Sequence, residues 1–402
     1  MRSMTPERNN VTMKMLTRIT ALCLSLFIVL GGCGNSPQPD GETETADSSN
    51  EIHETDLGTM RGLSVQELVA EMKTGWNLGN TLDANDGETS WGNPVTTHEM
   101  IDTVKAAGFD LIRIPTTWEK HFIDGDDYKI DEEWMNRVKE IVNYAFDNEM
   151  YVILNCHHET EWIKPTMAEV DGCLPKFKAM WTQIAETFKE YGNHLLFEGL
   201  NEPRIIGGEN EWGGGTDDNR QALNILNKAF VDTVRATGGN NSTRGLLITT
   251  VAAAVSDSAL KDLEIPDDKN IIVSLHAYTP YDFTYKGGKD IFEYSESVGS
   301  SIDWVFDLID SYFAEKKIPV IITEYGSVNK IKSFDVVPNP RYAENVKWVT
   351  RYLERAKQSG IPCIWWDNGV HYMGDELFGI LDREELNWFT PDLIDAIMKV
   401  YQ

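Results

Sequence analysis

Short apolar runs alternate with longer amphipathic stretches along the chain from Gly62 onward. Several of these runs are continuous in Val, Ile and Leu, which is typical of parallel strands that are covered on both faces. The pattern predicts eight strands, at residues 75–80, 111–116, 151–155, 195–200, 245–250, 271–275, 319–323 and 362–366. A chain built in this way is expected to adopt an α/β fold.

The stretches between the runs carry the apolar period of helices. Leu223, Leu226 and Phe230 fall on one face of a predicted helix. Asp217 at its start is a favoured capping residue, and Gly238 just past its end is a favoured stop. This stretch therefore predicts an amphipathic helix that packs against the sheet.

Two further stretches, 131–147 and 341–358, show the same helical pattern. The connection after the fifth strand is shorter and leaves room only for a brief helix near 256–263. Eight strands that are each followed by a helix predict one closed (β/α)8 TIM barrel, a single domain over 62–402. A doubly wound open sheet is the alternative, but no glycine-rich phosphate loop follows the first predicted strand.

The N-terminal segment differs from the body of the chain. Basic Lys14 and Arg18 precede an apolar run at 19–30, which is too short to span a bilayer but suits a signal peptide. The run ends in Leu-Gly-Gly before Cys33, which resembles a bacterial lipobox. That resemblance implies removal of residues 1–32 and lipidation of Cys33, with ordinary cleavage and an unmodified Cys33 as the alternative.

The segment after Cys33 is rich in Ser, Thr, Asp, Glu and Pro and nearly free of aliphatic residues. It cannot bury enough apolar surface to fold, so we expect a flexible tether over 33–61. The chain is then expected in the bacterial cell envelope, outside the cytoplasm, and attached to a membrane through the lipid on Cys33 alone.

The formal net charge is −28. A surface of this charge repels phosphate backbones, so nucleic acid is excluded as a partner, and it does not draw the folded domain toward anionic lipid. A neutral substrate is compatible with it. The sequence makes no prediction of the oligomeric state.

Five cysteines are present, and the predicted processing accounts for Cys23 and Cys33. Cys156, Cys173 and Cys363 are spaced neither as a disulfide framework nor as a metal site. Cys156 and Cys363 lie in apolar runs and are expected to behave as small core residues. A bridge between Cys156 and Cys173 stays open.

Polar and aromatic side chains gather at the C-terminal ends of the predicted strands. Barrels of this kind carry their chemistry at those ends, whereas an ordinary strand end more often carries a turn residue. Seven ends together predict a site, with Asn80, Arg113, His157, Asn201 and Glu202, His276 and Tyr278, Glu324, and Trp365 and Trp366.

Glu202 and Glu324 are two carboxylates on different walls of the predicted barrel. A separation of about 5–5.5 Å lets one attack an anomeric carbon while the other protonates the departing oxygen, and about 6.5–9.5 Å gives inversion. The pair therefore favours glycosidic cleavage. The alternative is that each carboxylate closes a structural ion pair.

The residues around these carboxylates resemble glycoside hydrolase family 5, the cellulase family. The segment 196–203 (LFEGLNEP) looks like its acid/base signature, and 323–326 (TEYG) looks like its nucleophile strand. The segments 75–83 (GWNLGNTLD) and 365–369 (WWDNG) are similar to the subfamily that contains endoglucanases, lichenases and xyloglucanases. The match continues, in the family's order, at Arg113, His157, His158, His276, Tyr278 and Trp366.

The resemblance implies retention of configuration, with Glu202 as acid/base and Glu324 as nucleophile. Arg113 and Tyr278 are placed to keep Glu324 ionised, and the negative charge of Glu324 is expected to raise the pKa of Glu202. Asn201 is the expected donor to the sugar 2-hydroxyl.

The remaining site residues are expected to bind substrate. Trp366 offers a flat face to a pyranose ring. His157, His158 and His276 are expected to be hydrogen-bonding members of the pocket and not metal ligands, because adjacent strand residues point to opposite faces. Loop aromatics either supply further platforms or lie in the core, with Trp91 ranked first as a platform among Trp91, Trp118, Trp162, Trp212 and Tyr281.

These residues predict an endo-acting β-1,4-glucanase that binds β-glucan polysaccharide or oligosaccharide and needs no cofactor or metal. Xyloglucan, mixed-linkage glucan and mannan stay open as the main substrate. One rival is a non-catalytic surface glycan-binding lipoprotein, which predicts that a catalytic glutamate is missing. Another is a metal-dependent barrel hydrolase, which predicts loss of activity on chelation.

Overall fold

The computed structural model describes the chain from residue 55 to its end, except for four short internal segments. The predicted signal peptide 1–32, Cys33 and most of the predicted tether lie outside the described residues. Within that described part, no helix is both long enough and apolar enough to cross a bilayer. The described ranges are 55–125, 127–285, 291–329, 341–372 and 376–402.

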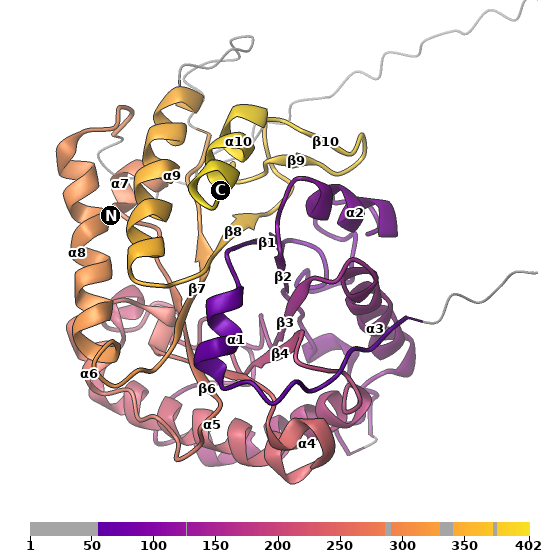
Figure 1. Ribbon diagram of the computed structural model, residues 1–402. Coiled ribbons are helices and arrows are strands. Elements are labelled where there is room, and N and C mark those ends of the chain that lie inside the picture. The colour runs from indigo at the N-terminus through magenta and orange to yellow at the C-terminus, as the bar shows by residue number, and fades with distance from the viewer. Residues whose placement is uncertain (1–54, 126, 286–290, 330–340, 373–375) are drawn as a thin grey trace, which may run out of the picture. The chain divides into compact units, whose positions relative to one another are not determined.

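Eight parallel strands form a closed barrel in sequence order (Figure 1). Their bounds are Thr74–Leu78 (β1), Leu111–Ile114 (β2), Tyr151–Asn155 (β3), Leu195–Glu198 (β4), Leu246–Thr249 (β5), Ile271–His276 (β6), Val320–Tyr325 (β7) and Cys363–Asp367 (β8). β8 pairs with β1, which closes the sheet. The predicted (β/α)8 barrel is therefore confirmed, and the open sheet is excluded.

Helices surround the barrel (Figure 1). The α-helices are Val65–Glu71 (α1), His98–Ala106 (α2), Glu132–Asp147 (α3), Val170–Thr187 (α4), Asp217–Ala236 (α5), Asp257–Lys261 (α6), Tyr281–Thr284 (α7), Glu296–Phe313 (α8), Arg341–Gln358 (α9) and Pro391–Val400 (α10). Short 3₁₀ turns occupy Glu119–His121, Glu211–Gly213, Gly239–Ser242 and Val251–Ala253. A two-stranded antiparallel sheet pairs Leu381–Asp382 (β9) with Asn387–Trp388 (β10).

The helix α5 illustrates how the sequence sets an element. Its apolar residues Leu223, Leu226 and Phe230 are buried, as predicted. The cap is one residue earlier than predicted, because the Thr216 hydroxyl and the Asn219 side chain form a reciprocal capping box. Asp217 therefore lies in the first turn, where its negative charge interacts favourably with the positive end of the helix dipole.

The inside of the barrel is packed at its N-terminal end. Alternate strand residues such as Leu111, Ile153 and Ile364 form one apolar cluster with Val65 and Leu68 of α1. Layers of branched side chains are typical of the interior of such barrels. The helix α1 therefore closes this end, and the opposite end is left for polar residues.

Residues 55–61 pack against the barrel, although the predicted tether includes them. The Leu57 carbonyl accepts from Gly192 at 2.8 Å, and the Thr59 carbonyl accepts from Asn193 at 3.2 Å. Arg61 pairs with Glu71 at 2.8 Å. The tether boundary at 61 is therefore too late, because backbone hydrogen bonds hold a segment whose side chains are mostly polar.

The three cysteines in the described residues are Cys156, Cys173 and Cys363. All three are buried free thiols, so Cys156 and Cys173 do not pair. Burial raises the pKa of each thiol and keeps it protonated. Cys156 and Cys363 lie in the main apolar cluster, as the sequence predicts.

Candidate active site

A cleft of about 1080 Å³ opens at the C-terminal ends of the barrel strands. Most of the residues predicted from the strand ends line this cleft, so the structure brings the predicted site together in one place. The predicted residues that line it are Asn80, Trp91, His157, His158, Asn201, Glu202, His276, Tyr278, Glu324 and Trp366.

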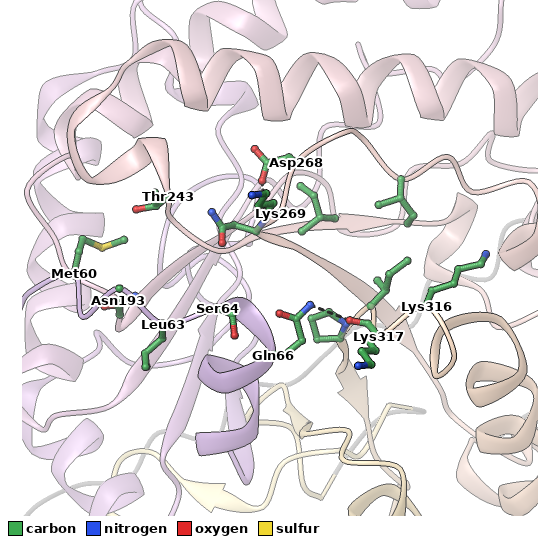
Figure 2. Close-up of a pocket in the computed structure, with 16 residues that line it drawn as sticks. Met60, Leu63, Ser64, Gln66, Asn193, Thr243, Asp268, Lys269, Lys316 and Lys317 are labelled. Carbon is green, nitrogen blue, oxygen red and sulfur yellow. Dashed lines mark hydrogen bonds between the residues drawn. The ribbon is translucent and has the colours of Figure 1, made fainter.

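A second hollow, of about 710 Å³, lies at the opposite end of the barrel (Figure 2). It is lined by Asn193, Thr243 and Asn270, each just before a strand, and by Gln66 of α1. The Gln66 amide donates to the Lys317 carbonyl at 2.9 Å. Because the N-terminal end of a barrel generally serves stability, the candidate active site is the cleft at the other end.

Glu324, in β7, has a hydrogen-bond donor on each carboxylate oxygen. Arg113 donates to Oε1 at 2.8 Å, and the Tyr278 hydroxyl donates to Oε2 at 2.9 Å. An irregularity in the β6–β7 pairing sets His276 opposite Glu324, and His276 Nδ1 lies 3.4 Å from Oε2. These contacts orient the carboxylate and favour its charged form.

Arg113 is fully buried, and its guanidinium reaches four side chains. Its Nε donates to Glu198 at 2.7 Å, and one terminal nitrogen is shared between Glu324 and Asn77, the latter at 3.0 Å. The other terminal nitrogen donates to Asn201 Oδ1 at 2.7 Å. Because Oδ1 is occupied, the Asn201 amide nitrogen is left to donate into the cleft.

Glu198 supports the site and is not among the residues predicted from the sequence. It ends β4, is fully buried, and accepts from both Arg113 and the Ser274 hydroxyl. The Ser274 and Thr323 hydroxyls lie 2.6 Å apart, which extends the network to β7. The sequence signal is a charged residue inside an apolar strand, because a buried carboxylate needs a partner.

Glu202 lies in the loop after β4 and meets a different set of groups. His276 Nδ1 is 2.7 Å from its Oε1, and Arg204 is 3.4 Å from its Oε2. Arg204 also donates to Glu211 at 3.0 Å and lies over the Trp212 ring at 4.1 Å. Sequence reasoning missed Arg204, whose only signal is its place two residues after Glu202.

The two carboxylates lie close together in the cleft. One oxygen of Glu202, one oxygen of Glu324 and a ring nitrogen of His276 all lie within 4.8 Å of one another. Double displacement at a sugar needs a separation of about 5–5.5 Å, and inversion needs about 6.5–9.5 Å. A separation of at most 4.8 Å is too short for an inverting pair and is therefore closer to the retaining arrangement.

The electrostatics of the pair depend on His276. Burial raises the pKa of Glu324, although the charges of His276 and Arg113 oppose this shift. Burial acts on Glu202 too, but the hydrogen bond and charge of His276 outweigh it, so the pKa of Glu202 is lowered. The sequence predicts the reverse for Glu202, because it does not reveal the contact with His276. His276 is therefore the residue that most lowers the pKa of Glu202.

The paired histidines after β3 lie closer together than strand geometry predicts. The rings of His157 and His158 are 4.5 Å apart, because both residues follow the last strand position and the alternation of faces ends there. With Asp83 they bring three ligand-type atoms within 4.8 Å of one another. His157 and His158 therefore do not point to opposite faces of a strand. The prediction that strand alternation keeps them from sharing a metal ion is wrong.

Burial keeps both of these imidazoles neutral at pH 7. It lowers the pKa of His158 to about 4 and that of His157 well below its ordinary value. Asn155 lies 3.0 Å from His157 Nδ1, and the His157 ring stacks on Trp366 with centroids 5.7 Å apart. The histidines are therefore placed for hydrogen bonding and for packing in the cleft.

Trp366 in β8 packs between His157 and the loop after β1. A Cβ atom at Gly79 would lie 2.9 Å from the Trp366 ring and 2.8 Å from the Asp367 carbonyl. Glycine is therefore required at position 79 for the indole to occupy its place. A flat apolar ring in a polar cleft is suited to stack on the face of a sugar.

Three of the five loop aromatics considered from the sequence line the cleft. Trp91, Trp212 and Tyr281 do so and are 42%, 59% and 56% exposed. Trp118 is instead fully buried, and its indole N–H donates to a backbone carbonyl at 3.0 Å. Trp162 is partly buried against the core. Both are therefore structural residues.

Three further aromatic residues line the cleft without having been predicted. Trp304 comes from α8, Tyr285 directly follows α7, and Phe378 lies between β8 and β9. None of them directly follows a barrel strand, so the strand-end pattern could not identify them. Their signal is a large aromatic residue on a polar helix face or in a polar loop.

Comparison with known sequences gives extensive matches. The family pattern described as cellulase, glycosyl hydrolase family 5, matches residues 76–372. Endoglucanase A of Ruminococcus albus is 50% identical over 350 residues, which are 85% of this chain and 94% of that protein. Endoglucanase A of Clostridium longisporum is 45% identical over 369 residues, which are 87% of this chain and 68% of that protein.

Comparison with solved structures agrees. A GH5-4 broad specificity endoglucanase from Ruminococcus champanellensis with bound cellotriose is 43% identical, with a TM-score of 0.80. The match covers 85% of this chain and 100% of that one. A GH5 xyloglucan-specific endo-β-1,4-glucanase from a metagenomic library, in complex with cellotriose, is 43% identical with a TM-score of 0.79. That match covers 83% of this chain and 98% of that one.

Proposed function

The chain belongs to glycosyl hydrolase family 5, the cellulase family, and is an endo-β-1,4-glucanase; we propose that it cleaves with retention through Glu324 and Glu202. The observation that carries this proposal is the pair of carboxylate oxygens within 4.8 Å of each other. Arg113 and Tyr278 donate hydrogen bonds to Glu324. His276 and Arg204 contact Glu202.

In the first step a Glu324 oxygen attacks the anomeric carbon and forms an ester with the sugar. The bond to the departing oxygen breaks, and Glu202, hydrogen-bonded to His276, gives that oxygen a proton. The Asn201 amide nitrogen donates to the 2-hydroxyl as the charge develops. The shortened chain with its new hydroxyl then leaves.

In the second step Glu202 takes a proton from water, and the resulting oxygen attacks the anomeric carbon. The ester bond to Glu324 breaks, and the carboxylate returns to Arg113 and Tyr278. Glu324 is uncharged while it is esterified, which removes the repulsion it exerts on an ionised Glu202. Two inversions leave the product in the β configuration.

We infer that the substrates are soluble or branched β-1,4-glucans, such as mixed-linkage glucan and xyloglucan. The cleft has a volume of about 1080 Å³ and is lined by exposed aromatic residues, including Trp91, Trp212 and Tyr281. Similar structures with bound cellotriose support a glucan in this cleft. The similarity to a xyloglucan-specific enzyme supports a branched chain as substrate.

A panel of cellulose, mixed-linkage glucan, xyloglucan and mannan, with sizing of the products, tests the proposed substrate. Early products of mixed lengths are expected from the glucans, and a preference for mannan would overturn the assignment. Proton NMR of fresh product tests retention. The β anomer is expected first, and an α anomer would require a single displacement.

Chelation tests the metal-dependent alternative. Two clusters of side chains that could hold a metal ion support this alternative. Glu202, His276 and Glu324 form one, and Asp83, His157 and His158 form the other. The proposed mechanism routes no step through a metal, so full activity is expected after exhaustive chelation. Loss of activity that added divalent metal restores would contradict it.

We propose that the enzyme is a lipoprotein of the bacterial envelope, anchored through Cys33. The apolar run and the cysteine that follows Leu-Gly-Gly support this location. Fractionation of cells is expected to place the wild-type protein with membranes and the Cys33→Ser variant in the soluble extracytoplasmic fraction. The same distribution for the wild-type protein and the variant would contradict a lipid anchor at Cys33.

A further inference from the structure

Trp304 is exposed on the solvent side of an amphipathic helix. The buried residues of α8 include Ile302, Val305 and Phe306, whereas the Trp304 side chain is 59% exposed. Large aromatic residues are usually buried, because leaving such an area in water forgoes hydrophobic free energy. Core packing therefore does not explain a tryptophan at this position.

Trp304 stands where two hollows meet. With Thr279 it lines both the catalytic cleft and an adjoining hollow of about 370 Å³. The helix α8 belongs to the outer ring of the barrel (Figure 1), so this hollow lies beside a helix and not at a strand end. Because Trp304 lines both hollows, a chain that lies in the cleft has a path to its face.

The cleft side of this path carries a second exposed aromatic residue, Tyr281, which is 56% exposed. Its ring stacks on Tyr285 at 5.0 Å and an interplanar angle of 17°. The Tyr285 hydroxyl donates to Glu376 at 2.6 Å, which fixes the pair. Tyr281 is therefore held as a flat platform before any ligand arrives, and this reduces the entropy lost on binding.

The hollow beside Trp304 also has polar groups of the kind that sugars need. Ser300 and Ser301 line it, and their hydroxyls donate to helix carbonyls at 2.9 and 3.0 Å. Each hydroxyl oxygen therefore keeps its acceptor capacity for a sugar hydroxyl. A flat apolar face beside such oxygens matches a pyranose ring, which has an apolar face and a polar rim.

We propose that Trp304, with Tyr281, forms an outer binding site for a glucose residue of the β-glucan chain beyond those at the carboxylates. This inference rests on the proposed function. The occupant is a neutral sugar in the same chain, because the hollow shares Thr279 and Trp304 with the cleft that holds the scissile bond. The site adds affinity for long chains and takes no part in bond cleavage.

The test compares kcat/KM for cellohexaose and cellotriose in purified wild-type protein and in Trp304→Ala. Cellohexaose is expected to extend from the carboxylates to Trp304, whereas cellotriose is expected to stay near the carboxylates. The kcat/KM for cellohexaose divided by that for cellotriose should therefore fall in the variant, on the order of fivefold to tenfold. Trp304→Phe should restore most of the ratio, because it restores a flat ring.

Tyr372→Ala is the matched control, because Tyr372 is 60% exposed and lies outside the cleft-lining set. It should leave the ratio at the wild-type value. A ratio unchanged in Trp304→Ala, or an equal loss on both substrates with normal thermal unfolding, would overturn the outer site. Failure of the wild-type protein to cleave either oligosaccharide would instead reject the proposed function.

Discussion

At the scale of single residues, the two carboxylates differ through the groups that reach them. Glu324 is served by a buried arginine and a tyrosine, whereas Glu202 is served by His276 and by the more exposed Arg204. Arg113 and Tyr278 favour the charged form of Glu324, whereas His276 can exchange a proton with Glu202. Unequal roles for two identical side chains follow from these neighbours.

Arg204 is expected to set the pH range of the enzyme. Its positive charge, 3.4 Å from Glu202, lowers the pKa of that carboxyl. In Arg204→Gln the pKa of Glu202 should rise, so the general acid keeps its proton to higher pH. The basic limb of the kcat/KM profile should therefore move up by roughly one pH unit.

Arg351→Gln is the control for this shift, because Arg351 pairs with Asp303 and does not line the cleft. Its pH profile should match the wild-type one. A basic limb that stays in place in Arg204→Gln, or moves to lower pH, would show that Arg204 does not tune Glu202.

Arg113 is expected to be essential for stability as well as for activity. Removing it leaves the buried Glu198 carboxylate without its cation. Arg113→Met should therefore lower the free energy of unfolding by roughly 3–5 kcal/mol. Denaturant titration measures this loss, and adding Glu198→Gln should recover part of it. A double variant no more stable than the single one would contradict the buried pair.

Many site residues could be predicted because each directly follows or ends an apolar run. Glu198 and Asn77 are not among them, because both lie within the predicted strands and act through Arg113. The effect of His276 on Glu202 is also hidden from the sequence, since it depends on a contact between the end of β6 and the loop after β4.

At the scale of elements, the apolar pattern predicts the barrel strands well because buried parallel strands are almost wholly apolar. The sequence predicts a flexible tether over residues 55–61, but backbone hydrogen bonds hold this segment and leave little trace in side-chain composition. The platform on α8 was missed for a related reason. The sequence around a tryptophan in a helix does not indicate whether a cleft lies beside that helix.

Residues 55–61 are expected to stabilise the barrel. A chain that begins at residue 62 loses the carbonyls of Leu57 and Thr59 and the ion pair of Arg61 with Glu71. Its unfolding temperature should be roughly 3–6 °C below that of a chain that begins at residue 55. Differential scanning calorimetry of the two truncated chains measures this, and equal midpoints would mean that the segment contributes nothing.

At the scale of the whole molecule, the net charge of −28 should affect anionic substrates only. Raising the salt from about 0.01 M to about 0.15 M screens repulsion between charges. The kcat/KM for carboxymethylcellulose should then rise severalfold, while that for neutral mixed-linkage glucan stays nearly constant. Equal salt dependence for both polymers would contradict this.

In the proposed mechanism, Glu324 forms the covalent intermediate and Glu202 transfers the proton. The most direct measurement incubates the enzyme with an activated 2-deoxy-2-fluoro-β-cellobioside, which traps the ester, and maps the modified peptide by mass spectrometry. One sugar per chain, attached to Glu324, is the predicted result. A label on Glu202 or on any other residue would contradict the proposed role of Glu324 as the nucleophile.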